Sequence, residues 1–295
     1  MSLVRIVRHL VVSARPRQWI KNAVVFAALV FAHELGNTQR VEQAALAFAL
    51  FCAASSATYV ANDLVDRARD RLHPTKRARP LATGELDPAL ALAFALTLAA
   101  GSLALAQTLL GRSFATVLAG FLALNLAYSL VLKRWIFVDV LAISLGFMLR
   151  ALAGAIAIDV PASAWLVVLT LFLALFLALN KRKAELVTLG EHAPAHRPVL
   201  GEYAPALLDQ LIAITTAGVI QVYALYTFNS VQPDHFVWSL PLVLYGIFRY
   251  LYLVARKGAG TTPEDALLGD APLLACVALW VALMVAFTWN VPLAR

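Results

Sequence analysis

Long apolar runs recur along the whole of this 295-residue chain and dominate what it can fold into. About 20 consecutive apolar residues form a helix that crosses the hydrocarbon layer of a membrane. The sequence predicts nine such helices, over 19–35, 43–62, 88–107, 113–132, 137–157, 162–180, 206–228, 236–254 and 271–291. Gly, Pro and Asn residues, which interrupt helices, separate many of them. We therefore expect an all-α polytopic membrane protein, with about nine transmembrane helices around a central cavity.

Composition excludes an ordinary water-soluble domain. Hydrophobic residues make up 61% of the chain and charged residues 14%, against about half and about a quarter in soluble proteins. Both cysteines, Cys52 and Cys276, lie inside apolar runs, which argues against disulfides and against a cysteine metal site. The net charge of +7 would suit nucleic acid, but the placement of the cations gives it another explanation.

Lys and Arg are concentrated on one predicted side of the membrane. If the N-terminus is cytoplasmic, 20 of the 24 Lys and Arg residues fall on cytoplasmic segments. Arg40, Arg112 and Arg295 fall outside, and Arg150 lies within a span. Cytoplasmic loops of membrane proteins carry such an excess of cations. The sequence therefore predicts a cytoplasmic N-terminus, an external C-terminus and a cavity that opens to the cytoplasm, and it explains the net charge without nucleic acid.

Residues 1–14 show a different pattern from the predicted spans. Apolar residues alternate there with Arg5, Arg8 and His9. This pattern is typical of an amphipathic helix that lies on the membrane surface. A weakly ordered terminus is an equally good interpretation, and both are kept.

The second predicted span ends in a row of acids. Asn62, Asp66 and Asp70 are spaced by four residues, and Asp63 lies beside them, so on a helix all four project from one face. Acids gathered at a membrane boundary are costly unless a cation binds them. Hard oxygen ligands suit Mg²⁺, which bridges to the phosphates of a substrate. We predict that Asn62, Asp63, Asp66 and Asp70 bind Mg²⁺ and a diphosphate.

Groups that bind phosphate oxygens lie on both sides of this row in the sequence. The segment 15–22 carries two Arg, a Lys and two amides at the start of the first span, and 76–79 follows the acids. Cations alone would also suit anchoring at the membrane surface, but amides at a membrane entry favour binding. The predicted substrate-binding residues are Arg15, Gln18, Lys21, Asn22, Lys76 and Arg79.

The sixth predicted span ends in a second charged group. Lys181 and Arg182 lie at helix-neighbour spacing from Glu185, so an ordinary ion-pair network is one interpretation. The other, which we adopt, is a phosphate-binding group opposite the acid row. Tyr128 and Lys133 belong to a looser polar group at the same edge of the membrane. All five are predicted to contact the substrate.

Arg150 lies well inside the fifth predicted span, where a guanidinium needs an anion or several carbonyls. Asp139 is eleven residues earlier and points the same way on a helix, which would bring an acid near it. Capping of backbone carbonyls near Gly146 or Gly154 is the structural alternative. Arg150 is kept among the predicted substrate-binding residues.

At these residues the sequence resembles the intramembrane prenyltransferase (UbiA) superfamily. Its members have nine spanning helices and the motif Asn-Asp-x-x-Asp-x-x-x-Asp after the second, which residues 62–70 match. Aromatic prenyltransferases of this superfamily carry a second Asp-rich motif after the sixth helix, which holds Mg²⁺ for an isoprenyl diphosphate. This chain has Asn-Lys-Arg-Lys-Ala-Glu at that position, which disfavours an isoprenyl diphosphate donor.

The decaprenyl-phosphate phosphoribosyltransferase branch of the superfamily is a closer resemblance. Segments 15–22, 73–80, 149–154 and 181–186 are similar to the signatures of that branch, as is Pro-Glu-Asp at 263–265. The resemblance implies transfer of phosphoribose from phosphoribosyl pyrophosphate to a polyprenyl phosphate. It also implies a bacterial cytoplasmic membrane and a product used for arabinofuranose donors and cell-wall polysaccharides.

On this interpretation, 1–295 is a single transmembrane catalytic domain with Mg²⁺ as its cofactor. Asp63, Asp66, Asp70 and Lys181 are expected to be catalytic. The expected partners are phosphoribosyl pyrophosphate, a polyprenyl phosphate and the bilayer, with no nucleic acid, and homo-oligomer formation is left open. Two alternatives are kept: an aromatic prenyltransferase that uses an isoprenyl diphosphate, and a non-enzymatic lipid-binding or transport protein.

Overall fold

The structure is a computed structural model that describes residues 3–32, 34–72, 76–190, 193, 197–229, 233–257 and 263–289. The described residues form helices and short connections, with no β-strand among them, which confirms the predicted all-α class. The helices, with 3₁₀ helices marked η, are α1 Leu3–Ala14, η1 Pro16–Phe26, α2 Ala27–Phe31, α3 Thr38–Asp70, η2 Lys76–Ala78, α4 Pro80–Thr83, α5 Pro88–Leu109, α6 Gly111–Leu130, η3 Leu132–Arg134, α7 Val138–Ala157, α8 Ala164–Leu189, η5 Pro198–Gly201, α10 Pro205–Phe228, α11 Pro233–Phe236, η6 Val237–Ser239, α12 Leu240–Lys257, α13 Pro263–Gly269 and α14 Ala271–Trp289.

Seven helices in the described part of the chain are long and apolar enough to cross a membrane. They are α3, α5, α6, α7, α8, α10 and the helical run Asp234–Arg256 that contains α12. Each coincides with one predicted span. The last predicted span coincides with α14, whose described apolar part, Ala271–Phe287, is shorter than these seven. The multi-span architecture is confirmed, whereas the predicted count of nine is not.

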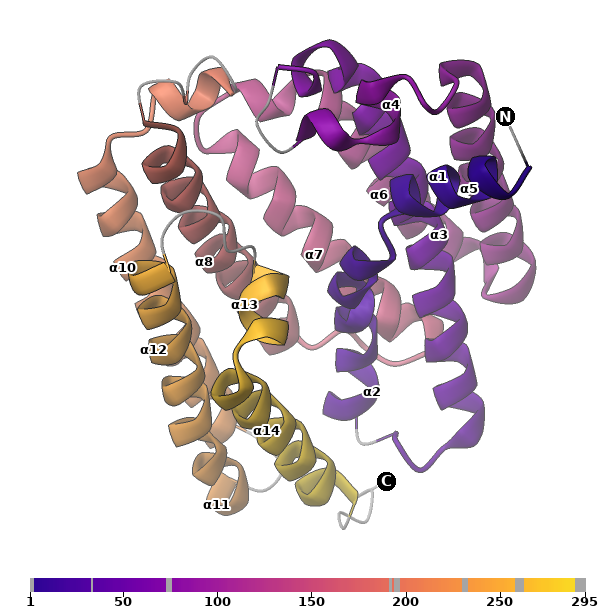
Figure 1. The fold of residues 1–295 in the computed structure, drawn as a ribbon. Coiled ribbons are helices and arrows are strands. Elements are labelled where there is room, and N and C mark those ends of the chain that lie inside the picture. The colour runs from indigo at the N-terminus through magenta and orange to yellow at the C-terminus, as the bar shows by residue number, and fades with distance from the viewer. Residues whose placement is uncertain are drawn as a thin grey trace.

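The helices lie in two groups with α7 between them, as Figure 1 shows. One group contains α1, α3, α5 and α6, and the other contains α8, α10, α12 and α14. Within the groups α3 packs on α5 and α6, and α8 packs on α10, while α7 contacts both α6 and α8. Side chains of α7 enter the apolar cores of both groups. We infer that α7 fixes the two groups relative to each other.

The predicted first span, 19–35, is not one continuous α-helix. It consists of the 3₁₀ helix η1 followed by the short helix α2. A 3₁₀ helix has three residues per turn, so Trp19, Asn22 and Val25 lie in one row along η1. Trp19 Nε1 donates a hydrogen bond to Ser56 Oγ at 3.1 Å, and Asn22 and Val25 are fully buried. The row docks η1 against α3 and α7.

Gly154 of α7 permits the close approach of η1. A Cβ added at Gly154 would lie 2.1 Å from the carbonyl oxygen of Val25, a separation that real atoms do not adopt. The backbone of η1 would therefore have to move before any larger residue fitted. Packing this tight, against backbone rather than a flexible side chain, is the reason that glycine is required here.

Gly154→Ala is predicted to lower the unfolding temperature of the purified protein, because overpacking of this kind costs about 1–3 kcal/mol. Gly120→Ala in α6 is the matched control, since an added Cβ there meets nothing within 4 Å. Thermal unfolding in detergent would compare the two variants. Equal unfolding temperatures for Gly154→Ala and the unmodified protein would contradict the packing argument.

Candidate active site

The acid row at the end of α3 is held in place by cations from three other segments. Asp63 is 3% exposed and accepts hydrogen bonds from Arg15 and, at 2.9 Å, from Arg79 Nη1. Arg79 Nη1 also donates to Asp70 Oδ2 at 2.6 Å. Lys133 Nζ donates to both carboxylate oxygens of Asp66, at 2.7 and 2.8 Å. The row therefore gathers the start of η1, the start of α4 and the η3 turn around one end of α3.

Arg67 and Arg71 of α3 do not compete for these acids. Arg67 Nε donates to the carbonyl of Leu81, and Arg71 Nε donates to the carbonyl of Ala82, both at 3.0 Å. These bonds tie α4 to the end of α3. A solvated helix end neutralised by its own arginines therefore does not describe the acid row.

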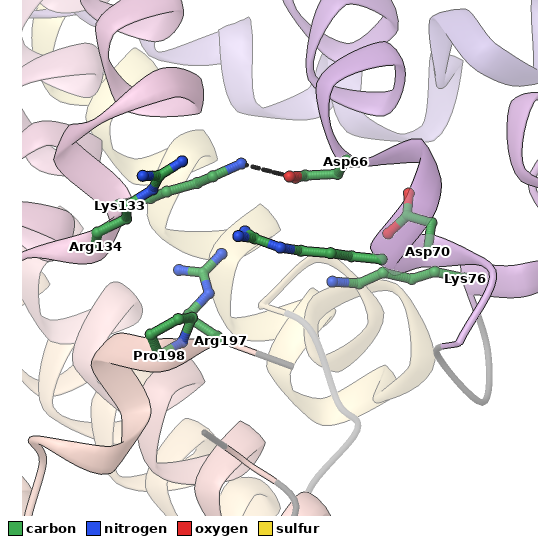
Figure 2. A pocket seen from close by; sticks show the side chains of 8 residues that line it. Asp66, Asp70, Lys76, Lys133, Arg134, Arg197 and Pro198 are labelled. Atoms are coloured by element: carbon green, nitrogen blue, oxygen red, sulfur yellow. Dashed lines mark hydrogen bonds and ion pairs between the residues drawn. The ribbon is translucent and has the colours of Figure 1, made fainter. Parts of the chain in front are cut away.

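A pocket opens beside the second half of the row (Figure 2). Its lining residues are Asp66, Arg69, Asp70, Lys76, Lys133, Arg134, Arg197 and Pro198. Two of the eight are carboxylates, five are cations, and Pro198 is the only apolar one. In Figure 2, Asp66 and Asp70 approach from α3, whereas Lys133, Arg134 and Arg197 approach from the opposite side. The side formed by α3 and the segment after it carries both acids together with Arg69 and Lys76, and the charged residues of the opposite side are all cations; we call these two sides the acidic wall and the cationic wall.

A second polar network lies behind the cationic wall. Asp139 at the start of α7 is fully buried, and its Oδ2 accepts from Arg182 Nε of α8 at 2.6 Å. Arg182 also donates to Glu185 Oε2 at 2.8 Å and to the hydroxyl of Tyr128 at 3.2 Å. Arg197 reaches the same tyrosine hydroxyl at 3.1 Å. Arg197, which lines the pocket, therefore contacts a buried network that joins α6, α7 and α8.

Arg150 is surrounded by neutral groups. Its Nε donates to Asn22 Oδ1 at 2.7 Å, and its Nη1 donates to the Gly146 carbonyl at 2.9 Å. Its guanidinium also lies over the Phe121 ring, with Cζ 4.5 Å from the ring centroid. The acid that the sequence suggested, Asp139, pairs with Arg182 instead. These contacts favour the carbonyl-capping alternative, and the substrate role of Arg150 stays a prediction.

Comparison with known proteins places the chain in a family. A model of the UbiA prenyltransferase family matches residues 23–268. The chain belongs to the UbiA prenyltransferase family. This confirms the resemblance seen in the motifs.

Two relatives of this UbiA chain are similar to it over nearly their whole length. The decaprenyl-phosphate phosphoribosyltransferase of Corynebacterium glutamicum is 33% identical over 288 residues, which cover 95% of this chain and 86% of that protein. The protein of the same name from Mycobacterium tuberculosis is 34% identical over 285 residues, covering 94% and 93%. A solved UbiA homologue from Archaeoglobus fulgidus, bound to GPP and Mg²⁺, has a TM-score of 0.74 at 19% identity. It covers 96% of this chain and 100% of that one, and it shows that the fold is shared.

Some of the predicted site residues line the pocket, and others lie elsewhere in the structure. Asp66, Asp70, Lys76 and Lys133 line it. Those that lie in the surrounding ion-pair networks are Arg15, Asp63, Arg79, Tyr128, Arg182 and Glu185. Asn62, Gln18, Lys21 and Lys181 are partly exposed and do not line the pocket. Asn22 is fully buried against Ser55, Cys52 and Arg150, away from the pocket lining. The motif residues His73, Pro74 and Thr75 lie outside the described residues.

Three pocket arginines, Arg69, Arg134 and Arg197, are absent from the predicted site residues. Arg69 adjoins Asp70 in the sequence. Arg134 adjoins Lys133, so that adjacency was a usable signal. Arg197 follows α8 in the segment before α10, and nothing in its local sequence indicates that it returns to the end of α3. No group of three or more His, Cys, Asp or Glu side chains in the described part of the chain is arranged to hold a metal ion.

Lys76 has a perturbed acidity that follows from its position in the pocket. Burial lowers its pKa from the ordinary 10.5, and the positive charges of Arg79 and Arg197 lower the pKa further. Glu185 and Asp70 act in the opposite direction. Since the charged form is disfavoured, Lys76 loses its proton at a lower pH than an ordinary lysine.

Anion binding at the pocket is predicted to weaken at alkaline pH. The Lys76 charge that attracts an anion is present below its lowered pKa and is lost as the pH rises through it. Sulfate is a suitable probe because its charge is constant, and its affinity can be titrated by calorimetry between pH 7 and pH 10. Lys76→Arg keeps its charge and should move the loss of affinity to higher pH. Superimposable pH profiles for the variant and the unmodified protein would refute the assignment.

Proposed function

We propose that this UbiA-family protein transfers phosphoribose from phosphoribosyl pyrophosphate to a polyprenyl phosphate of the decaprenyl type. The bond from the anomeric carbon to the pyrophosphate breaks, a bond to the lipid phosphate oxygen forms, and pyrophosphate leaves. The observation that carries the proposal is the pocket with one acidic and one cationic wall. Relatives that bear the name of this activity, at 33% and 34% identity over nearly the whole chain, support it.

The pocket lining suits phosphoribosyl pyrophosphate because this donor is anionic at both ends. Its diphosphate would lie at Asp66 and Asp70, and its separate phosphate monoester at Arg134 and Arg197. Arginine binds phosphate in a bidentate manner, which suits the monoester end. An isoprenyl diphosphate has only one anionic end and needs apolar walls for its tail, whereas Pro198 is the only apolar lining residue.

Mg²⁺ is proposed as the cofactor on the chemistry of the donor set. Mg²⁺ is commonly bound by one or two carboxylates together with substrate phosphates. Asp66 and Asp70, one helical turn apart, supply two carboxylates at one wall, which fits that pattern. Asp63 is engaged by Arg15 and Arg79 and, unlike Asp66 and Asp70, does not line the pocket, so we assign it to holding these two arginines, with Asn62 at the edge of the metal site. When bound, Mg²⁺ would neutralise negative charge on the departing pyrophosphate.

The acceptor phosphate needs cations rather than a general base. A phosphate monoester is already mostly ionised at pH 7, because its second pKa is about 6. Lys181 and Arg182 at the end of α8, with Arg15, Gln18 and Lys21 at the start of η1, are proposed to hold it in line with the anomeric carbon. The chain thereby contributes orientation and electrostatic stabilisation of the transition state. We expect inversion at the anomeric carbon.

The two alternatives explain the site less well. An aromatic prenyltransferase would need acids after the sixth predicted span, where the described chain has Arg182 paired with Asp139 and Glu185. A transporter is expected to hold its substrate near the middle of the membrane, on interrupted helices. Here the charged pocket lies at the end of α3.

The pocket is proposed to face the cytoplasm of a bacterial cell. Cations from 15–21, 67–79, 133–134 and 181–197 meet at the pocket end of the helices, as cytoplasmic segments would.

Helix α1 is proposed to lie on the same membrane surface. Its Val4, Val7 and Val11 form one exposed apolar face. A spin label at Val7 that is as accessible to a water-soluble relaxation agent as one at Arg8 would contradict this placement.

Turnover by the purified protein in detergent with Mg²⁺ tests the proposal. One reaction contains phosphoribosyl pyrophosphate with a polyprenyl phosphate, and the other contains an isoprenyl diphosphate with an aromatic acid. The expected result is a phosphoribosylated lipid that disappears when EDTA removes the metal. Prenylation of the aromatic acid would establish the first alternative instead. Uptake of substrate without turnover would establish the second.

Asp66→Asn and Asp70→Asn are predicted to lower turnover by about 100-fold or more, because each removes a carboxylate that binds the metal and diphosphate. Asp209→Asn is the matched control, since Asp209 pairs with Lys183 on the exposed surface of α10 and α8. Initial rates at several Mg²⁺ concentrations would measure the effect. Rates in Asp66→Asn equal to those of the control would remove the metal assignment.

A further inference from the structure

The segment 197–203 brings Arg197 to the pocket from outside the transmembrane helices. It lies between α8 and α10 and contains the single 3₁₀ turn η5. Arg197 and Pro198 at its start line the pocket. A connecting segment keeps a side chain at a fixed place only where other contacts restrain its backbone. Such contacts are found at the other end of the segment, at Tyr203.

The Tyr203 hydroxyl joins this segment to the start of α7. It donates a hydrogen bond to Asp139 Oδ1 at 2.8 Å and accepts one from the backbone N–H of Phe137 at 3.0 Å. Tyr203 is 3% exposed and Asp139 is fully buried. Burial and the Asp139 carboxylate both raise the pKa of Tyr203, so the hydroxyl stays protonated and remains a donor.

Phe137 adopts a backbone conformation that needs such support. Its φ is +65°, in the left-handed region that residues other than glycine seldom adopt. Strained conformations of this kind persist only where the surroundings hold them. Phe137 lies directly between the turn that carries Lys133 and Arg134 and the first turn of α7. The bond from its N–H to Tyr203 therefore acts on the part of the chain that supplies two more cations of the pocket.

Asp139 connects Tyr203 back to Arg197. Its second oxygen, Oδ2, accepts from Arg182 Nε at 2.6 Å and lies 3.8 Å from Arg197 Nη1. Arg197 and Arg182 also share the Tyr128 hydroxyl. One buried carboxylate thus contacts both ends of the 197–203 segment. Polar networks that are fully satisfied in this way rigidify the groups they join.

We infer that Tyr203 is a positioning residue, which through Asp139 and the Phe137 backbone sets the place of Arg197, Lys133 and Arg134 in the pocket. The inference rests on the proposed function. It assigns to Tyr203 the specific task of forming the cationic wall that receives the phosphate monoester of the donor. Asp70 of the acidic wall is held separately, by Arg79, whereas Asp66 is bound by Lys133, so Tyr203 acts mainly on the monoester end of the donor.

Tyr203→Phe removes the hydroxyl and keeps the ring, which packs edge-on against Phe137 with centroids 6.0 Å apart. Two probes distinguish the two walls. Ribose 5-phosphate carries only the monoester, and inorganic pyrophosphate with Mg²⁺ carries only the diphosphate. Calorimetry on the purified variant should show binding of ribose 5-phosphate weakened about tenfold, as expected for a lost hydrogen bond to a charged group. Binding of Mg²⁺–pyrophosphate should fall by clearly less, because Arg79 holds Asp70 independently of Tyr203.

Tyr223→Phe is the matched control. Tyr223 is also a buried tyrosine, whose hydroxyl accepts from Trp280 Nε1 at 2.8 Å. It lies 18 residues beyond Pro205, about 27 Å along α10 from the segment in question. This variant should bind both probes as the unmodified protein does, and a loss of ribose 5-phosphate binding equal to that of Tyr203→Phe would overturn the inference.

Arg197→Gln is the second variant if Tyr203→Phe folds poorly. The Arg197 side chain is 23% exposed, so the fold should tolerate its substitution better than that of the buried Tyr203. It too should weaken binding of ribose 5-phosphate more than binding of Mg²⁺–pyrophosphate. Where both single variants fold, the loss of ribose 5-phosphate binding in their double variant should be smaller than the sum of the two single losses, because Tyr203 acts in part through Arg197. Additive losses, or unchanged binding in either single variant, would overturn the inference while the proposed function stands. An unmodified protein that binds neither probe would overturn both.

Discussion

The Asp63 carboxylate is the interaction on which the arrangement of the pocket depends. It is 3% exposed and engages Arg15 and Arg79, which precede η1 and α4. Removal of one partner from a buried ion pair costs about 3–5 kcal/mol, because it leaves an uncompensated charge. Asp63 therefore ties the N-terminal segment and the chain after α3 to one point. Asp70 is two helical turns further on and shares Arg79 with it, so the place of Asp70 in the acidic wall is set by the same contacts.

The acid row and the helical class could be predicted from the sequence because both depend on local periodicity. A spacing of four residues places Asp66 and Asp70 on one face wherever that helix packs. The first predicted span failed for a related reason. Its composition is apolar, but the row of Trp19, Asn22 and Val25 requires three residues per turn to meet α3 and α7. Hydropathy records only that the segment is apolar and does not distinguish a 3₁₀ helix from an α-helix.

Contacts between distant segments set the limit of what the sequence reveals about the site. Asp139 was expected near Arg150 from helical spacing alone, yet it pairs with Arg182 of the neighbouring helix. Arg150 instead satisfies its donors with Asn22 and a carbonyl of its own helix. Arg197 and Tyr203 act from a connecting segment, where no periodic pattern fixes the direction of a side chain. Tertiary packing determines the partner of each of these side chains. No local pattern in the sequence reveals that packing.

On the proposed function, the charges of the pocket explain why one acidic wall is sufficient. Two carboxylates and five cations line it, which leaves a net charge of +3 before any ligand enters. A donor with a monoester and a diphosphate carries about four to five negative charges, and one Mg²⁺ reduces this to about two to three. The lining and the metal-bound donor are thus close to neutral together. A second acid cluster, as in a site that binds two metals, would add negative charge where the acceptor phosphate must also approach. Arg182, buried between Asp139 and Glu185, is the group that this chain has in place of such a cluster.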